Sequence, residues 1–266
     1  MADPVPGQGS GADPGGLAAL SWPDVPCGAV VLVPLGSFEQ HGPHLPLDTD
    51  TVIASAVAHG AVRQPAPPDG EAGTCPGAVV VAPALPYGAS GEHQHFAGTV
   101  SLGRDALVLV LLEMVRSLAS WAGKVVFVNG HGGNVEALAL VVPQLIEEGH
   151  KVGWVHCRFD GADAHAGRTE TSLMLHLAPE RVRLERAERG NTAPVAELMP
   201  AMVDGGVQSV SSNGVLGDPA GASAAEGSSL LAGAVGDVLL RLAGSPDGRG
   251  FLQPAKAAAR QMSATP

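Results

Sequence analysis

KVVFVNGHGGN, at residues 124–134, joins a short apolar run to a glycine-rich turn with a histidine at its centre. The run, at residues 124–128, has the length and β-branched content of a buried strand. A strand that continues straight into this turn places His131 at its carboxyl end, between glycines that allow positive φ and close approach by a ligand. The segment therefore predicts a strand of the central sheet with a candidate ligand residue at its end.

Similar units occur on both sides of this segment. Further buried strands are predicted at 29–35, 78–82 and 151–155, and helices at 51–63, 104–122, 135–148, 169–177 and 224–243. Near-continuous apolar strands that alternate with helices indicate the α/β class, with a mostly parallel sheet covered on both faces. In such sheets ligands bind beyond the carboxyl ends of the strands.

The chain of 266 residues reads as one domain between two tails. Gly and Pro dominate residues 1–16, which we expect to be a disordered tail. A composition of the same kind predicts a flexible tail at 245–266, so the folded domain is expected to span 17–244. Residues 64–77 are expected to form a loop.

Charge and cysteine content exclude several classes of function. The net charge is −11 and no basic cluster occurs, which argues against nucleic acid and anionic membranes as partners. No run approaches the roughly 18 apolar residues of a membrane span. Three widely separated cysteines favour a reducing compartment, so we expect a cytoplasmic protein.

Potential metal ligands crowd the segment GSFEQHGPHLPLDTD, at residues 36–50. Glu39 and His41 are two positions apart and point to the same side of an extended chain. Carboxylate with imidazole is a usual ligand combination for Zn, Fe or Mn. The alternative is a polar capping loop with Asp50 as helix N-cap. We favour metal binding for this segment. We also favour it for His131, because NGHGGN lacks the spacing of a phosphate-binding loop.

Two later segments add weaker candidates. DAHAGRTETS, at residues 163–172, contains His165 and Glu170, although an acidic residue also favours a helix N-terminus through the dipole. YGASGEHQHFAGT, at residues 87–99, contains His93, which we regard as a possible substrate contact or a structural histidine. A serine nucleophile elbow is missing, and Cys157 next to His156 is better explained by packing than by thiol catalysis.

Four ordered segments together resemble the creatininase family of metal-dependent amidohydrolases: GSFEQHGPHLPLDTD, NGHGGN, HAGRTETS and GVLGDPAGASAAEG. The resemblance spans about residues 29–243. It implies a three-layer α/β/α sandwich with a two-metal site at the sheet edge, and a homo-oligomer. The metals would be Zn, Fe(II) or Mn.

The resemblance also implies the metal ligands. Family ligands correspond to Glu39, His41, Asp50 and His131, with Asp50 bridging two divalent ions. Creatinine-hydrolysing members carry a Glu where this chain has Gly133, which argues against creatinine as substrate. Glu170 is the best remaining carboxylate for the fifth ligand.

The hypotheses for catalysis follow from the residue types at these positions, and the hypothesis for the substrate follows from the resemblance. We expect His165 to act as general acid and His93 to contact substrate. Within the family, the chain is most similar to peptidases that release a modified C-terminal Val-Tyr piece from a ribosomally made precursor during redox-cofactor biosynthesis. The alternatives are a small-molecule amidohydrolase acting on a formamide or cyclic amide, and a non-enzymatic metal-binding protein. An open groove would favour a peptidase and a closed pocket a small-amide enzyme.

Overall fold

A four-stranded sheet forms the centre of the computed structural model, which describes residues 16–63, 78–159 and 161–255. Its strands are β1 (Val30–Leu35), β2 (Val79–Val81), β3 (Lys124–Asn129) and β4 (Val152–His156). Their order is β2-β1-β3-β4, and every adjacent pair is parallel. The predicted α/β class with a parallel sheet is confirmed.

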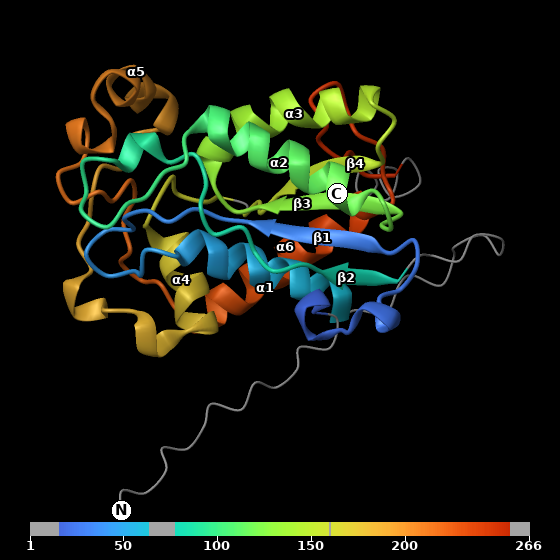
Figure 1. Cartoon of the computed structure of the whole chain (residues 1–266). Coiled ribbons are helices and arrows are strands. Elements are labelled where there is room, and N and C mark those ends of the chain that lie inside the picture. Colours follow the sequence, from blue (N-terminus) through green and yellow to red (C-terminus); the bar gives the residue numbers. More distant parts are fainter. Residues whose placement is uncertain (1–15, 64–77, 160, 256–266) are drawn as a thin grey trace, which may run out of the picture.

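Helices cover both faces of this sheet and complete three layers (Figure 1). One face carries α2 (Arg104–Leu118) and α3 (Val135–Glu147). The other carries α1 (Thr49–Arg63), α4 (Arg168–Leu177) and α6 (Ala224–Leu242). Across the described part of the chain, no helix has both the length and the apolar content needed to cross a bilayer.

Both faces of each central strand are apolar, and this explains why the strands read as continuous apolar runs. In β3, Val125 and Phe127 belong to the core under α2 and α3. Val126 and Val128 belong to the core on the face of α1 and α6. Alternate side chains of a strand point to opposite faces, so a sheet between two helical layers needs apolar residues at every position.

The strand register brings the carboxyl ends of three strands together. Leu35 of β1 pairs with Asn129 of β3, which in turn pairs with His156 of β4. The segments that follow these strands therefore leave the sheet at one edge. These are the segments in which the sequence predicts ligand residues.

Two parts of the fold differ from the sequence prediction. Helix α5 (Val195–Gly205) was not predicted, and it lies apart from the three layers (Figure 1). Residues 245–255 were expected to belong to a flexible tail, but they pack along the outer edge of β4. Leu252 is fully buried and its N–H donates to the Trp154 carbonyl. Residues 1–15, 64–77 and 256–266 lie outside the described residues.

Candidate metal centre

Five predicted ligands converge at the carboxyl edge of the sheet. Glu39 and His41 lie in the segment after β1, Asp50 in the first turn of α1, His131 after β3 and Glu170 in the first turn of α4. Glu39, His41, Asp50 and His131 are buried and Glu170 is half-buried. Segments far apart in the sequence thus form one compact cluster.

The first group of potential ligands consists of Glu39, Asp50 and His131. His131 Nδ1 lies 3.2 Å from Glu39 Oε1 and 3.3 Å from Asp50 Oδ2. These two carboxylate oxygens are buried and lack a hydrogen-bond partner. A buried anionic oxygen without a partner is costly, so its environment favours a cation.

The second group consists of His41, Asp50 and Glu170. His41 Nδ1 donates to the Glu39 carbonyl, so its Nε2 faces Asp50 Oδ1 at 3.2 Å and Glu170 Oε2 at 3.9 Å. Asp50 therefore offers one oxygen to each group. This is the arrangement needed for a carboxylate that bridges two ions.

A third possible group contains Glu39, His41 and His165. It shares Glu39 with the first group and His41 with the second, whereas the first and second groups share only Asp50. If both of the first two groups hold ions, His165 is left free for another role. His165 Nε2–H donates to the Gln40 carbonyl at 2.8 Å, and its Nδ1 faces the cluster 3.8 Å from Glu39 Oε1.

Protonation of the cluster shows that it attracts positive charge. Burial opposes the charged form of His41, but the neighbouring carboxylates, with Asp50 first, raise its pKa to about 10. Burial likewise opposes the charged form of His131, and Glu39 and Asp50 hold its pKa well above the usual range. Protons on both histidines thus neutralise the carboxylates when no metal is bound, and the donor set fits divalent ions.

Two other groups of the cluster are shifted toward their neutral forms. Burial raises the pKa of Glu170 to about 7, against the lowering effect of His41. Burial and the nearby charge of His41 hold the pKa of His165 well below its usual range. His165 is therefore a neutral imidazole whose Nδ1 carries a lone pair.

His93 lies inside the cluster rather than at its rim. Its Nδ1 is 2.8 Å from the Gln40 side-chain amide nitrogen, and its Nε2 is 3.3 Å from Glu39 Oε1. The amide N–H donates to Nδ1, so Nε2–H points to Glu39. The buried ring also lines the adjacent cleft, where it can meet a substrate.

The start of α4 fixes the position of Glu170. Asp163 accepts hydrogen bonds from the backbone N–H groups of Arg168 and Thr169, which would otherwise lack partners at the helix N-terminus. Ala166 N–H donates to Glu170 Oε2 at 2.6 Å. Glu170 is thereby held with this oxygen toward His41.

The glycines in the turn after β3 have a different structural role from the predicted one, which was positive φ and close approach by a ligand. Gly130, Gly132 and Gly133 do not have positive φ. A Cβ at Gly133 would lie 2.2 Å from the Ala89 carbonyl oxygen and 2.5 Å from His131 Nε2. Gly133 is needed because protein atoms, rather than a ligand, pack against its backbone.

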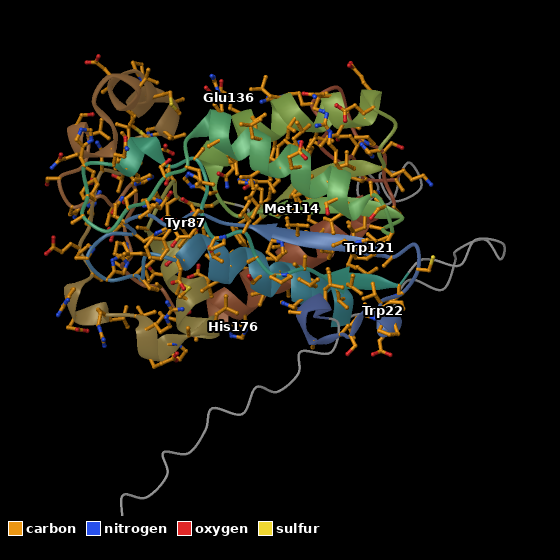
Figure 2. The ribbon with its side chains drawn as sticks, in the orientation of Figure 1. Trp22, Tyr87, Met114, Trp121, Glu136 and His176 are labelled. Atoms are coloured by element: carbon orange, nitrogen blue, oxygen red, sulfur yellow. The ribbon has the colours of Figure 1, made fainter. Side chains whose placement is uncertain are left out.

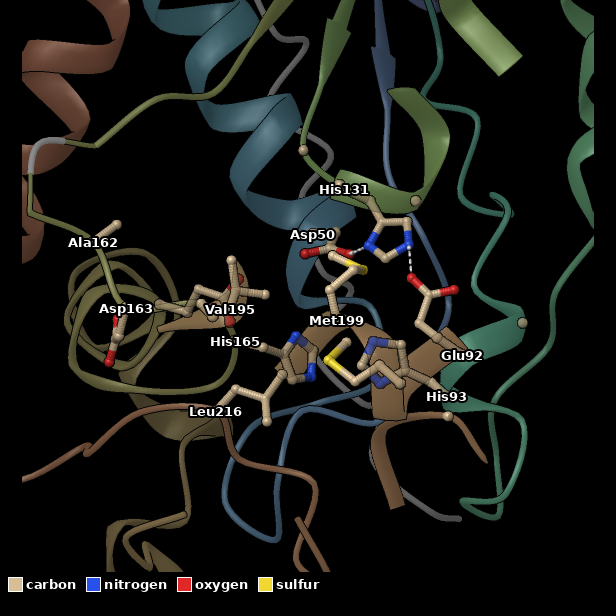
Figure 3. Close-up of a pocket in the computed structure, with 18 of the residues that line it drawn as sticks. Asp50, Glu92, His93, His131, Ala162, Asp163, His165, Val195, Met199 and Leu216 are labelled. Carbon is tan, nitrogen blue, oxygen red and sulfur yellow. Dashed lines mark ion pairs between the residues drawn. The ribbon is translucent and has the colours of Figure 1, made fainter. Parts of the chain in front are cut away.

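A cleft of about 960 Å³ opens beside the cluster. Asp50, His131, His165 and Glu170 line it. Apolar residues of α5 line it as well, among them Val195 and Met199 (Figure 3) and also Val203. Met199 and Val203 are exposed to solvent.

Sequence reasoning missed several residues that build the site. Gln40 holds His93, and the Asn129 side chain donates to the His131 carbonyl. The Asn134 side chain donates to the Gly36 carbonyl and so ties the turn after β3 to the segment after β1. Glu92 also lies in the site, 3.4 Å from His131 Nε2. Its position directly before His93, in a segment already singled out for histidines, is a signal that could have identified it.

Comparison with known proteins agrees with this geometry. The family model Creatininase, described as creatinine amidohydrolase, matches residues 18–241. A mycofactocin precursor peptide peptidase from Mycolicibacterium smegmatis is 55% identical over 225 residues, covering 84% of this chain and 88% of that protein. A creatinine amidohydrolase from Pseudomonas putida is 30% identical, covering 59% of this chain and 67% of that protein.

A solved structure described as "Creatininase Mn" has the same fold. It superposes with a TM-score of 0.62 at 27% identity, covering 80% of this chain and 89% of that one. The three-layer architecture and the match over nearly the whole domain point to the same conclusion. The chain belongs to the creatininase family of hydrolases.

Proposed function

We propose that this protein is a metal-dependent peptidase that hydrolyses a peptide bond in the modified mycofactocin precursor peptide and releases its C-terminal Val-Tyr-derived piece. The observation that carries the proposal is the cleft of about 960 Å³ beside the paired ligand groups. This volume is near the upper end of the range for ligand pockets, roughly 300–1,000 Å³, and leaves room for a peptide segment. The similarity to the mycobacterial peptidase supports the substrate.

The metal site would use the first two ligand groups. Glu39, Asp50 and His131 would hold one divalent ion, and His41, Asp50 and Glu170 the other. Divalent ions held there would supply a water of lowered pKa and would polarise the amide carbonyl. The mixed imidazole and carboxylate donors suit Zn, Fe(II) and Mn.

His165 is the proposed proton carrier. Its Nδ1 lone pair faces the cluster, while its Nε2–H is held by the Gln40 carbonyl. Nδ1 can accept a proton from the attacking water and return it to the departing amine. The neutral state of the ring suits the first of these steps. His93, on the same side of the cleft, is the proposed substrate contact.

The second candidate is a small-molecule amidohydrolase acting on a formamide or cyclic amide. Its support is the similarity to creatinine amidohydrolase, which covers a smaller part of the chain at lower identity. A small amide would leave most of the cleft filled with water. Gly133 also lacks the carboxylate that the resemblance associates with creatinine hydrolysis. We therefore rank this candidate second.

Two further features stay predictions. The three separated cysteines support a reducing, cytoplasmic location. Family resemblance supports a homo-oligomer, which light scattering of the purified protein would test.

The test is a mass-spectrometric cleavage assay with the modified precursor peptide. The protein is stripped with chelator and reloaded separately with Zn, Fe(II) or Mn. A Glu39→Ala, His131→Ala double variant removes two ligands of the first group, and His176→Ala serves as the control. His176 is an exposed histidine in the last turn of α4 (Figure 2) and is not one of the residues that line the cleft.

We expect a C-terminal dipeptide-sized fragment from the metal-loaded protein and the control, and none from the stripped protein or the double variant. Metal uptake without cleavage of the peptide would contradict the proposal. Hydrolysis of formamides or cyclic amides in that case would move the second candidate to first place.

A further inference from the structure

His131 is held at both of its ring nitrogens. Nδ1 faces Glu39 and Asp50, as described above. Nε2–H donates to the Ala89 carbonyl at 3.2 Å, and Glu92 Oε1 lies 3.4 Å from the same nitrogen. Figure 3 shows the ring between the carboxylates of Asp50 and Glu92. The ring therefore has a metal-facing side and an opposite side that is occupied by a second carboxylate.

Glu92 reaches this position from another part of the chain. It lies in the short helical turn Gly91–His93, whereas His131 follows β3. A Cβ at Gly133 would be 2.8 Å from Glu92 Oε1. Any larger residue at 133 would therefore displace the carboxylate from His131. The glycine and the glutamate thus form one local arrangement.

Glu92 is placed to act on His131 rather than on an ion. The groups of potential ligands found in the described residues do not include it, because it lies behind the ring. A carboxylate that contacts the far nitrogen of a ligating histidine fixes the tautomer and the ring orientation and increases the basicity of the ligand. With a proton on Nε2, the lone pair is on Nδ1, which faces Glu39 and Asp50.

We propose that Glu92 is a positioning residue that holds His131 in the Nδ1-coordinating state, and thereby sets the affinity of the first metal group. The inference rests on the metal site of the proposed function. It does not depend on which amide is cleaved. Metal affinity, measured without substrate, therefore tests it separately from the peptidase assignment.

The experiment compares Glu92→Ala and Glu92→Gln with a matched control, Glu136→Gln. Glu136 also lines the cleft, but it pairs with Arg104 and its side chain is 67% exposed. The full chain is stripped of metal, and its affinity for Zn or Mn is measured by competition with a chromophoric chelator. The number of bound ions and the unfolding transition of the metal-free protein are recorded for each variant.

We expect Glu92→Ala to lower the affinity of one ion by about 10–100-fold, the usual effect of removing such a partner. Two ions should still bind at saturation, and the metal-free variant should unfold like the parent. Glu92→Gln keeps an acceptor oxygen without the charge, so its affinity should fall between those of the parent and Glu92→Ala. Glu136→Gln should stay within about twofold of the parent.

Three results would overturn the proposal. Unchanged affinity in Glu92→Ala would show that the Ala89 carbonyl alone positions His131. Loss of one bound ion at saturation would make Glu92 a direct ligand. If Glu92→Ala lowered the unfolding free energy of the metal-free protein by as much as it lowered the free energy of metal binding, the contribution of Glu92 would be merely structural.

Discussion

Asn134 offers a test of how the fold holds the metal centre. The fully buried side chain joins three segments: its Oδ1 accepts from Ala89 N–H at 2.8 Å, and its Nδ2 donates to the Gly36 carbonyl at 3.0 Å and to Asn129 Oδ1 at 3.1 Å. Ala89 precedes the turn with His93, Gly36 follows β1, and Asn129 is the last residue of β3. Asn134→Ala would remove all three hydrogen bonds.

The expected cost follows from the groups that lose their partners. Ala89 N–H and the Gly36 carbonyl are left unpaired in the interior, whereas Asn129 Oδ1 keeps the bond from His131 N–H. An orphaned buried group costs about 1–3 kcal/mol, so the variant should lose about 2–6 kcal/mol of unfolding free energy. Metal affinity should fall as well, because the turn that carries His131 loses its attachment to the neighbouring segments.

Urea denaturation of the metal-free protein measures the first effect, and chelator competition measures the second. Asn191→Ala is the matched control: this half-buried asparagine bonds Val210 and Ala193, neither of which belongs to the ligand groups. Its metal affinity should not change. A loss below about 1 kcal/mol in Asn134→Ala, with unchanged metal affinity, would refute the reasoning.

Three further predictions follow from the geometry of the site. Gly133→Ala should lower metal affinity at least about tenfold, because its Cβ meets the Ala89 carbonyl and His131. Gly132→Ala should leave the affinity unchanged, because its Cβ would meet nothing within 4 Å. Equal affinities of the two variants would contradict this prediction. Burial raises the pKa of Cys157 to about 12, so at pH 8 iodoacetamide should label the exposed Cys27 and spare Cys157. Peptide mapping would show which cysteine is labelled, and rapid labelling of both would be inconsistent with the burial of Cys157. Metal binding must displace the proton of His41, whose pKa is about 10, the proton of His131, whose pKa is also raised, and below about pH 7 that of Glu170. Affinity should therefore rise with pH by about tenfold per unit for each proton released, and a flat profile from pH 6 to 9 would contradict this.

The strands and most helices could be predicted because their pattern is set locally. Strands with two buried faces must be apolar at each position. The observed bounds of β1 and β3 differ from the predicted ones by one residue at one end, and β4 is shifted by one residue. Helix α5 escaped prediction because Pro200 lies inside it and Gly205 and Gly206 stand at its end, a composition typical of turns. The sequence does not show that its apolar residues border a cleft.

The prediction of a flexible tail at 245–266 was wrong for residues 245–255, because composition does not show which distant residues a segment packs against. Gly and Pro surround Phe251 and Leu252, yet Leu252 fills a core position and the backbone pairs with the edge of β4. This segment covers an edge strand, which would otherwise expose unpaired backbone groups. The partner lies about a hundred residues away in the sequence, so no local pattern could identify it.

Residue type, and the rule that strand ends meet at one edge, identified the segments that contain the candidate ligands, whereas the assignment of Asp50 and Glu170 as ligands came from the family resemblance. Their division into two groups was not, because it depends on which oxygen of Asp50 faces which histidine. The role of Gly133 was also hidden, since the atoms around it come from Ala89 and Glu92. Contacts between distant segments therefore decide the fine geometry of this site.

Anomalous X-ray diffraction from crystals loaded with Zn or Mn would test the central claim most directly. The account predicts two ions that share Asp50, one in contact with Glu39 and His131 and the other with His41 and Glu170. A single ion, or ions that do not contact Asp50, would contradict it.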